Sequence, residues 1–181
     1  METFVFNDDN LCLEEISTHV PKARAIIINN QNQIMLSNYA GVYMFPGGKI
    51  EKKEDIIETL QRELFEELGI SFAKSECIPF LTIQQYIKNY PIVHQEQTQN
   101  RLWETFYFII FSDKEISTQK QLSEREKLGK FTTKMYSIDE VYSLIEKNDT
   151  SNPRKKYFDR ELLCLLKKIQ LEDEKVLHYE C

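Results

Sequence analysis

Short apolar runs separated by polar turns fill the early part of the chain and predict β-strands. Residues 23–28 are apolar and rich in β-branched side chains, which is typical of a buried strand. The polar residues 29–32 predict a turn, and residues 33–37 predict the returning strand. A further apolar run, residues 43–45, stops at residues 46–48, whose two glycines indicate unusual backbone dihedral angles or a very close neighbour.

Between Asp55 and Leu68 the hydrophobic period changes to that of an α-helix. Apolar residues recur at steps of three and four, so they share one face. These residues are Ile56, Ile57, Leu60, Leu64 and Leu68. Gly69 follows as a helix-ending residue. We therefore predict a helix whose apolar side faces the core.

After this helix the pattern returns to strands. Residues 79–86 and 102–111 predict two strands, with residues 88–100 as a polar loop or hairpin tip between them. Residues 112–130 are charged and turn-like, and residues 132–136 predict one more strand.

Two helices are expected to close the chain. Ser137 to Glu140 has the sequence of a capping box that opens a helix through about Lys147. Residues 159–169 predict a second amphipathic helix, and residues 154–156 a solvated lead-in to it. Residues 1–18 give no clear period. Strands around a central helix, followed by two helices, indicate an α/β (α+β) fold in one layered domain.

Composition narrows the class of protein. The 181 residues suit one domain, and a hydrophobic share of 41% is enough for a core. There are 23 Lys and Arg residues against 29 Asp and Glu residues, and this acidic balance argues against a nucleic-acid-binding module. The longest apolar run, residues 106–111, is far shorter than the roughly 20 residues that cross a membrane. The first residues do not resemble a signal peptide, and the four cysteines are scattered, so we expect reduced thiols and a cytoplasmic protein.

Three carboxylates in the central helix carry the strongest chemical signal. Glu63, Glu66 and Glu67 are spaced i, i+3 and i+4, within roughly a third of the helix circumference and beside the apolar face. Such groups repel one another unless they are solvated or share a cation. One interpretation is a solvated acidic face. The other is a Mg²⁺ or Mn²⁺ site, in which the preceding Gly47-Gly48 loop approaches a phosphate or offers a carbonyl oxygen to the metal.

The same segment resembles a known family signature. It reads Gly48-x5-Glu54-x7-Arg62-Glu63-Leu64-x-Glu66-Glu67-x-Gly69-Ile70, which fills every fixed position of the Nudix box of Nudix hydrolases. The lead-in over residues 43–48, with its aromatic residues and Pro-Gly-Gly, resembles the family as well. The resemblance extends over roughly residues 19–147.

The resemblance implies a fold and a domain organisation. The expected fold is an α/β/α sandwich with a mixed β-sheet and the box as a loop–helix–loop. Residues 19–147 would form the Nudix domain, residues 1–18 an N-terminal segment, and residues 148–181 a C-terminal helix and tail packed on the same domain.

It also implies an activity. The expected protein is a pyrophosphatase, a hydrolase of phosphorus-containing anhydrides, which uses Mg²⁺ or Mn²⁺ to cleave a nucleoside diphosphate linked to another group. ADP-ribose and other nucleotide sugars, dinucleoside polyphosphates and nucleoside triphosphates all remain open as substrates. The alternatives are a catalytically silent nucleotide-binding or sensor module of the same fold and an interaction protein built on the last helix. The expected partner is a small nucleotide derivative rather than nucleic acid or membrane, and a homodimer is compatible with the sequence.

Site residues carry over by position in the box. Glu63, Glu66 and Glu67 would be metal ligands, with the carbonyl of Gly48 completing the set. Arg62 would pair with Glu54 and hold the helix in register, although an ordinary surface ion pair is the plainer interpretation.

The general base is left open by the sequence. Glu63 or Glu67 can serve within the box, and family members also use an acid outside it. The outside candidates are Glu96, Glu104, Glu115, Glu124 and Glu126. Of these, Glu104 ranks first within regular structure, and Glu115 or Glu124 ranks first in loops.

Substrate contacts are open too. Arg24, costly to bury alone, is expected to meet either a substrate phosphate or Glu104 across the sheet. Aromatic residues can stack on a base or simply belong to the core; they are Tyr43, Phe45, Tyr86 and Trp103. Gly47 offers backbone groups to the substrate, and Arg101 is either a phosphate contact or a solvated rim residue.

Overall fold

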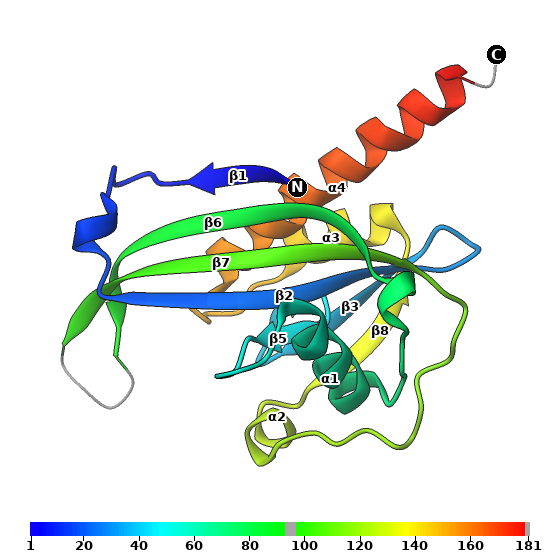
Figure 1. Cartoon of the computed structure of the whole chain (residues 1–181), viewed down its shortest axis with the longest axis horizontal. Coiled ribbons are helices and arrows are strands. Elements are labelled where there is room, and N and C mark those ends of the chain that lie inside the picture. The colour runs from blue at the N-terminus through cyan, green and yellow to red at the C-terminus, as the bar shows by residue number, and fades with distance from the viewer. Residues whose placement is uncertain (93–96, 180–181) are drawn as a thin grey trace.

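A mixed β-sheet runs through the whole molecule (Figure 1). The computed structural model describes residues 1–92 and 97–179, with side chains described through residue 171. Within these residues the sheet has eight strands in the order β1-β6-β7-β2-β3-β4, with β5 paired to β2 and β8 paired to β3. Pairing of β1 with β6 and of β2 with β7 is parallel, whereas the remaining pairs are antiparallel.

The strands and helices alternate along the chain. The strands are β1 (Glu2–Phe6), β2 (Thr18–Ile28), β3 (Ile34–Tyr39), β4 (Val42–Met44), β5 (Gly47–Lys49), β6 (Ile78–Pro91), β7 (Thr98–Phe111) and β8 (Thr132–Tyr136). The α-helices are α1 (Ile56–Leu68), α2 (Glu124–Leu128), α3 (Ile138–Lys147) and α4 (Lys155–Tyr179). Two single turns of 3₁₀-helix cover Leu13–Glu15 and Lys74–Glu76.

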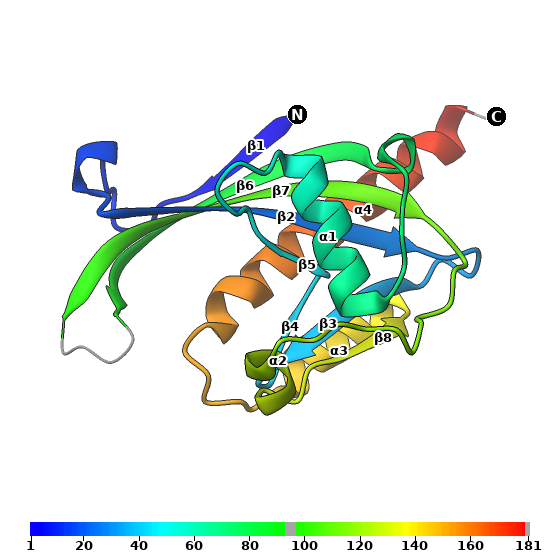
Figure 2. The ribbon, with the colours of Figure 1, turned by 60° about the horizontal axis from the view of Figure 1, so that its bottom comes forward.

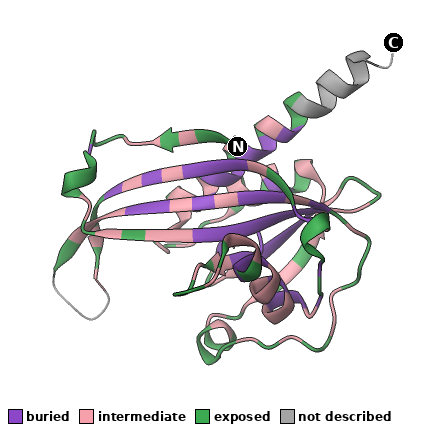
Figure 3. Ribbon diagram, viewed as in Figure 1, coloured by how far each residue is buried: buried purple, intermediate pink, exposed green. Residues whose placement is uncertain are grey.

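Helices cover the two faces of the sheet and form a layered structure. Alternate residues of β2 divide between these faces, because side chains along a strand point in opposite directions. Ala23, Ala25 and Ile27 pack with the apolar side of α1, whereas Ile26 packs with Tyr107 and the leucines of α4. The buried residues follow the middle of the strands and the facing sides of the helices (Figure 3). The predicted α/β class with a mixed sheet is confirmed.

Several elements are longer than predicted or were not predicted at all. Of the loop or hairpin tip expected at residues 88–100, the hairpin is present, but its strands are longer than expected, because β6 reaches Pro91 and β7 begins at Thr98. The turn-like segment 112–130 contains the short helix α2. β1 occupies part of the segment that showed no period, because its strand form comes from parallel pairing with β6. The four central residues of the tip, 93–96, lie outside the described residues.

The sheet opens between β2 and β3. These strands share a single residue pair, Ile28 with Ile34, and β3 then pairs with β4 and β8 (Figure 2). The middle of β2 pairs instead with β5, through residues 22–24. Beside this opening, Val20, Lys22 and Arg24 of β2 line a cavity. Within the described residues, no helix has the length and apolar character needed to cross a membrane.

Candidate active site

Helix α1 is fixed at both ends and along one side. The Asp55 side chain accepts a hydrogen bond from the backbone N–H of Glu58, and the Glu58 carboxylate accepts one from Asp55 N–H in return. This capping box starts the helix. Gly69 ends it in the left-handed region, at φ 67°. The fully buried Leu60 and Leu64 set its rotation and thereby aim the glutamates beside them at the opening of the sheet.

Gly47 and Gly48, which the sequence placed in a loop, begin strand β5 and lie directly against the glutamates of α1. Gly47 N–H donates a hydrogen bond of 3.0 Å to the Glu67 carboxylate. Gly47 has φ 122°, and a Cβ there would overlap the carbonyl oxygen of Ala23. A Cβ on Gly48 would overlap the carboxylate of Glu63. The two glycines are therefore required for close approach of β5 to the helix, which agrees with the very close neighbour expected from the sequence.

Arg62 organises the carboxylates around it. It donates to Glu54 at 2.6 and 3.0 Å, to Glu63 at 2.9 Å and to Glu66 at 3.2 Å. The first of these pairs lowers the pKa of the Glu54 carboxyl to about 2. The predicted pairing of Arg62 with Glu54 is present, and it ties the start of α1 to its middle.

Glu67 has the most unusual environment of the three box carboxylates. Its exposed fraction is only 5%, and burial raises the pKa of its carboxyl to about 8, although Arg24 and the Gly47 N–H act in the opposite direction. Burial also raises the pKa of Glu63. Both groups would gain from a cation placed among them, since a positive charge favours the ionised form.

A cavity of about 480 Å³ opens beside these carboxylates. It combines carboxylates, a set of basic side chains and several aromatic faces. The carboxylates are Glu63, Glu67 and Glu126. The basic residues are Lys22, Arg24, Lys49, Arg101, Arg125 and Arg154. The aromatic residues are Tyr39, Tyr90, Trp103, Phe131 and Phe158.

The structure brings some of the expected substrate contacts into this cavity. Arg24, Gly47, Arg101 and Trp103 all line it. Arg24 is 5% exposed, and its guanidinium donates to the Phe45 carbonyl oxygen while its Nε has no partner among the described residues. Arg24 thus makes no pair with Glu104, whose carboxylate lies outside the cavity, and its contact with a substrate phosphate stays a prediction.

Other expected contacts lie elsewhere. Phe45 is 1% exposed and packs edge-on against Tyr107, so it belongs to the core. Tyr43 packs against Tyr136 at a different surface hollow. Glu104 accepts a hydrogen bond from Gln84 and contacts His19 outside the cavity.

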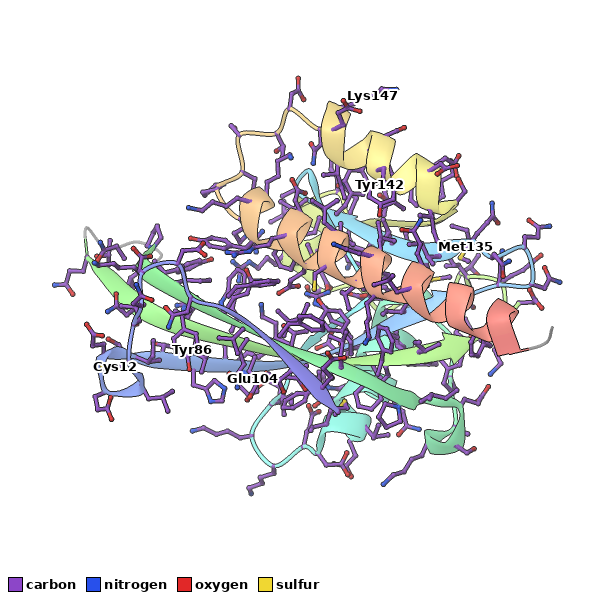
Figure 4. The ribbon with its side chains drawn as sticks, turned by 90° about the horizontal axis from the view of Figure 1, so that it is seen from above. Cys12, Tyr86, Glu104, Met135, Tyr142 and Lys147 are labelled. Carbon is purple, nitrogen blue, oxygen red and sulfur yellow. The ribbon has the colours of Figure 1, made fainter. Side chains whose placement is uncertain are left out.

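Figure 4 places Glu104 and Tyr86 along the β6 and β7 side of the sheet. Strand alternation explains why Glu104 points away from the cavity, since its neighbour Trp103 lines the cavity instead.

The acidic residues outside the box differ in whether they line the cavity. Glu126 lines the cavity, and its charge acts on Glu67. Glu124 is exposed and pairs with Lys127 at 2.6 Å, and Glu115 is exposed as well. Glu96 lies outside the described residues. The sequence ranking of Glu104, Glu115 and Glu124 above Glu126 does not match their places in the structure.

Sequence reasoning missed part of the basic lining. Lys22 was not singled out, and Arg154 was expected in a solvated segment, whereas both line the cavity. For Lys22 a signal was present, because it stands two residues before Arg24 and must share its side of the strand. For Arg154 the sequence carried no such signal, since its place depends on how the segment before α4 folds back.

The donor atoms at the site fit a hard divalent cation of the kind that the resemblance implies. Carboxylate oxygens and a backbone carbonyl are the ligands that Mg²⁺ and Mn²⁺ prefer. Among the described residues, no three acidic, Cys or His side chains stand together as a ready-made metal group. Arg62 holds an oxygen of Glu63 and one of Glu66 in this arrangement.

Comparison with known proteins decides the family. The model of the NUDIX domain matches residues 18–162 of this chain. The chain belongs to the NUDIX family. The resemblance seen in the box is thereby confirmed, and the match extends well beyond the box on both sides.

The curated relative found for this NUDIX chain matches only a short part of it. It is 46% identical over 46 residues to an 8-oxo-dGTP diphosphatase from Buchnera aphidicola, a match that covers 25% of this chain and 35% of the relative. The chain thus spans about a third of that relative's length.

Solved structures share its fold. The MutT protein from Bacillus halodurans has a TM-score of 0.51 at 23% identity, covering 79% of this chain and 82% of that one. A NUDIX hydrolase from Nitrosomonas europaea has a TM-score of 0.52 at 18% identity, covering 78% of this chain and 88% of that one.

Proposed function

We propose that this chain is a metal-dependent pyrophosphohydrolase that cleaves a nucleoside diphosphate linked to another group. The observation that carries the proposal is the shared cavity, in which the box carboxylates Glu63 and Glu67 meet the buried cation Arg24. In such a site, positive groups can neutralise the phosphates of a pyrophosphate substrate, and a carboxylate can act as the base that activates water. The description of the Buchnera relative as a diphosphatase supports the same reaction class.

The proposed roles fall into two groups: residues that bind the metal and the phosphate, and residues that position helix α1. Glu63, Glu66 and Glu67, with the Gly48 carbonyl, would hold Mg²⁺ or Mn²⁺, which supplies charge neutralisation at the phosphates and a water of lowered pKa. Arg24 would bind a phosphate oxygen from the wall of the cavity. Arg62 keeps α1 and its carboxylates in register with β5 through its contacts with Glu54.

A carboxylate at the cavity would remove the proton from the attacking water. Glu63, Glu67 and Glu126 meet this requirement by position. We favour Glu126, because Glu63 and Glu67 are engaged as cation ligands in this proposal. It lies in α2, on a segment joined to α1 by backbone hydrogen bonds from Ser117 N–H to Leu68 O and from Gln121 N–H to Glu66 O, each 2.9 Å.

Turnover of a nucleotide panel tests the proposal. The panel contains ADP-ribose, a dinucleoside polyphosphate, canonical nucleoside triphosphates and 8-oxo-dGTP, each assayed for product release with Mg²⁺, with Mn²⁺ and with EDTA. We expect metal-dependent cleavage of one substrate class. Glu66→Gln and Glu67→Gln should lower kcat by about 100-fold or more, because each removes a charged ligand.

Glu58→Gln is the matched control on the same helix. Glu58 is exposed and serves in the capping box, where glutamine can replace it, so activity should stay near that of the wild type. Tight nucleotide binding without turnover under any metal condition would instead identify a catalytically silent sensor. A cytoplasmic location and a homodimer stay predictions.

A further inference from the structure

Beside the box carboxylates, one part of the cavity holds basic side chains without acidic partners. Lys22 is 8% exposed, and its ammonium lies 3.5 Å from the centroid of the Trp103 ring. Within the described part of the chain its ammonium makes no hydrogen bond or ion pair. An aromatic face stabilises a cation, but by much less than the hydration free energy that burial removes.

Two arginines share this arrangement. The guanidinium of Arg101 lies 4.2 Å from the centroid of Tyr90, and its buried Nε has no partner among the described residues. The guanidinium of Arg154 lies 5.3 Å from the centroid of Tyr39. The three cations come from β2, from β7 and from the segment before α4, yet they line one cavity.

The rings beneath Lys22 and Arg101 pack against one another. The Trp103 centroid lies 5.6 Å from that of Tyr90 and 5.5 Å from that of Phe158. Contact with these packed rings restricts the positions of Lys22 and Arg101 before any ligand arrives. Such restriction lowers the entropic cost of binding.

The protein itself does not balance these charges at close range. Burial, together with repulsion from Arg24, Arg154 and Arg101, lowers the pKa of Lys22 to about 7, with Glu161 acting in the opposite direction. The Glu161 carboxylate is itself occupied, because it accepts hydrogen bonds from Gln85 and from the hydroxyl of Tyr107. An anionic group entering the cavity would supply the missing counter-charge.

We propose that Lys22, Arg101 and Arg154 form a second anion site, which binds an additional phosphate of the substrate away from the phosphates cleaved beside α1. This inference rests on the proposed function and narrows its substrate class. The preferred substrate carries a phosphate on the group linked to the pyrophosphate, or a longer phosphate chain. A neutral base or sugar in the same place would displace water from the cations and leave them unpaired, which is costly.

Metal-free binding of inorganic tripolyphosphate tests this site without any hydrolysis. Calorimetric titration in EDTA, at pH 6.5 where Lys22 is largely protonated, should give saturable binding to the wild type. Lys22→Met and Arg101→Gln should each weaken the affinity about 10-fold or more, as expected for losing a charge-assisted contact. Lys134→Met is the matched control, since Lys134 also lies over a ring, that of Tyr136, but outside this cavity.

Two further measurements distinguish loss of the anion site from misfolding and from loss of the proposed catalytic function. Thermal unfolding should show Lys22→Met at least as stable as the wild type, because it removes a buried charge that lacks a close partner. Glu67→Gln should lose hydrolysis and keep tripolyphosphate binding, so the two proposals can fail independently. Failure of the wild type to bind, or equal affinity in the wild type, Lys22→Met and Arg101→Gln, would overturn the second anion site.

Discussion

Glu124 and Glu126 stand two positions apart in α2 but have different surroundings. Glu124 pairs with Lys127 at an exposed surface, whereas Glu126 lines the cavity and accepts hydrogen bonds from the backbone N–H and hydroxyl of Ser123. These bonds restrict the position of the Glu126 carboxylate at the cavity. Glu124, of the same type and in the same short helix, therefore serves as a control for the role of Glu126 in the reaction.

Glu126→Gln should lower kcat by about 100-fold to 10,000-fold with little change in KM, because glutamine cannot accept the proton of the attacking water. Glutamine can replace glutamate in the capping box, so α2 should keep its fold. Steady-state kinetics with the substrate found in the panel measures the effect. Glu124→Gln is the control and should behave as the wild type; equal kinetics in both variants would remove Glu126 from the reaction.

The sequence predicts the roles of site residues only where their spacing along the chain fixes their positions. The box glutamates and the Arg62–Glu54 pair are set by fixed intervals along one helix and its lead-in, so the sequence contained them. The burial of Glu67, the choice among outside acids and the place of Arg154 depend on segments that meet only in three dimensions. Spacing along the chain carries no information about such meetings.

At the scale of elements, the end of α1 and the segment after β7 form one joint. Gly69 N–H donates to Phe65 O at 2.8 Å, and the next free carbonyls of the helix accept from Ser117 and Gln121. The last carbonyls of a helix need such partners when they are not solvated. Helix α1 was predictable because its period and its caps agree, whereas the joint was not, since residues 112–130 show no apolar period.

Gly69→Ala should destabilise the protein by about 1–3 kcal/mol. At φ 67° an alanine is strained, and its Cβ would come within 2.7 Å of the Ser117 Cβ. Chemical denaturation measures the loss, and kcat should fall with it, because Ser117 belongs to the segment that carries Glu126. A variant as stable and as active as the wild type would show that this joint does not position Glu126.

At the scale of the molecule, the first strand and the last helix close the sheet together. β1 pairs with β6 along the edge, and Phe4 and Phe6 pack against the cluster that includes the leucines of α4. Ion pairs join the same parts, Arg160 to Asp8 at 2.6 Å and Lys168 to Glu2 at 2.7 Å. The sequence predicted α4 from its amphipathic pattern but not β1, whose pairing partner lies about 80 residues away.

Removal of residues 1–7 should lower stability and cause association. The β6 edge would lose its paired strand, and exposed strand edges are prone to pair with other chains. Light scattering and analytical ultracentrifugation would show larger species that grow with concentration. A matched full-length variant, Asp8→Asn, loses an ion pair but keeps the strand, and it should stay in the same state as the wild type; a truncated chain that also does so would refute this role of β1.

The bonds that join residues 117–121 to α1 use main-chain atoms on both sides. Nearly every amino acid can supply such an N–H group. Substitutions at these residues should therefore be tolerated. Insertions should not be, because one inserted residue would move Glu126 away from Glu67. Related chains should accordingly vary in sequence along this stretch more readily than in its length.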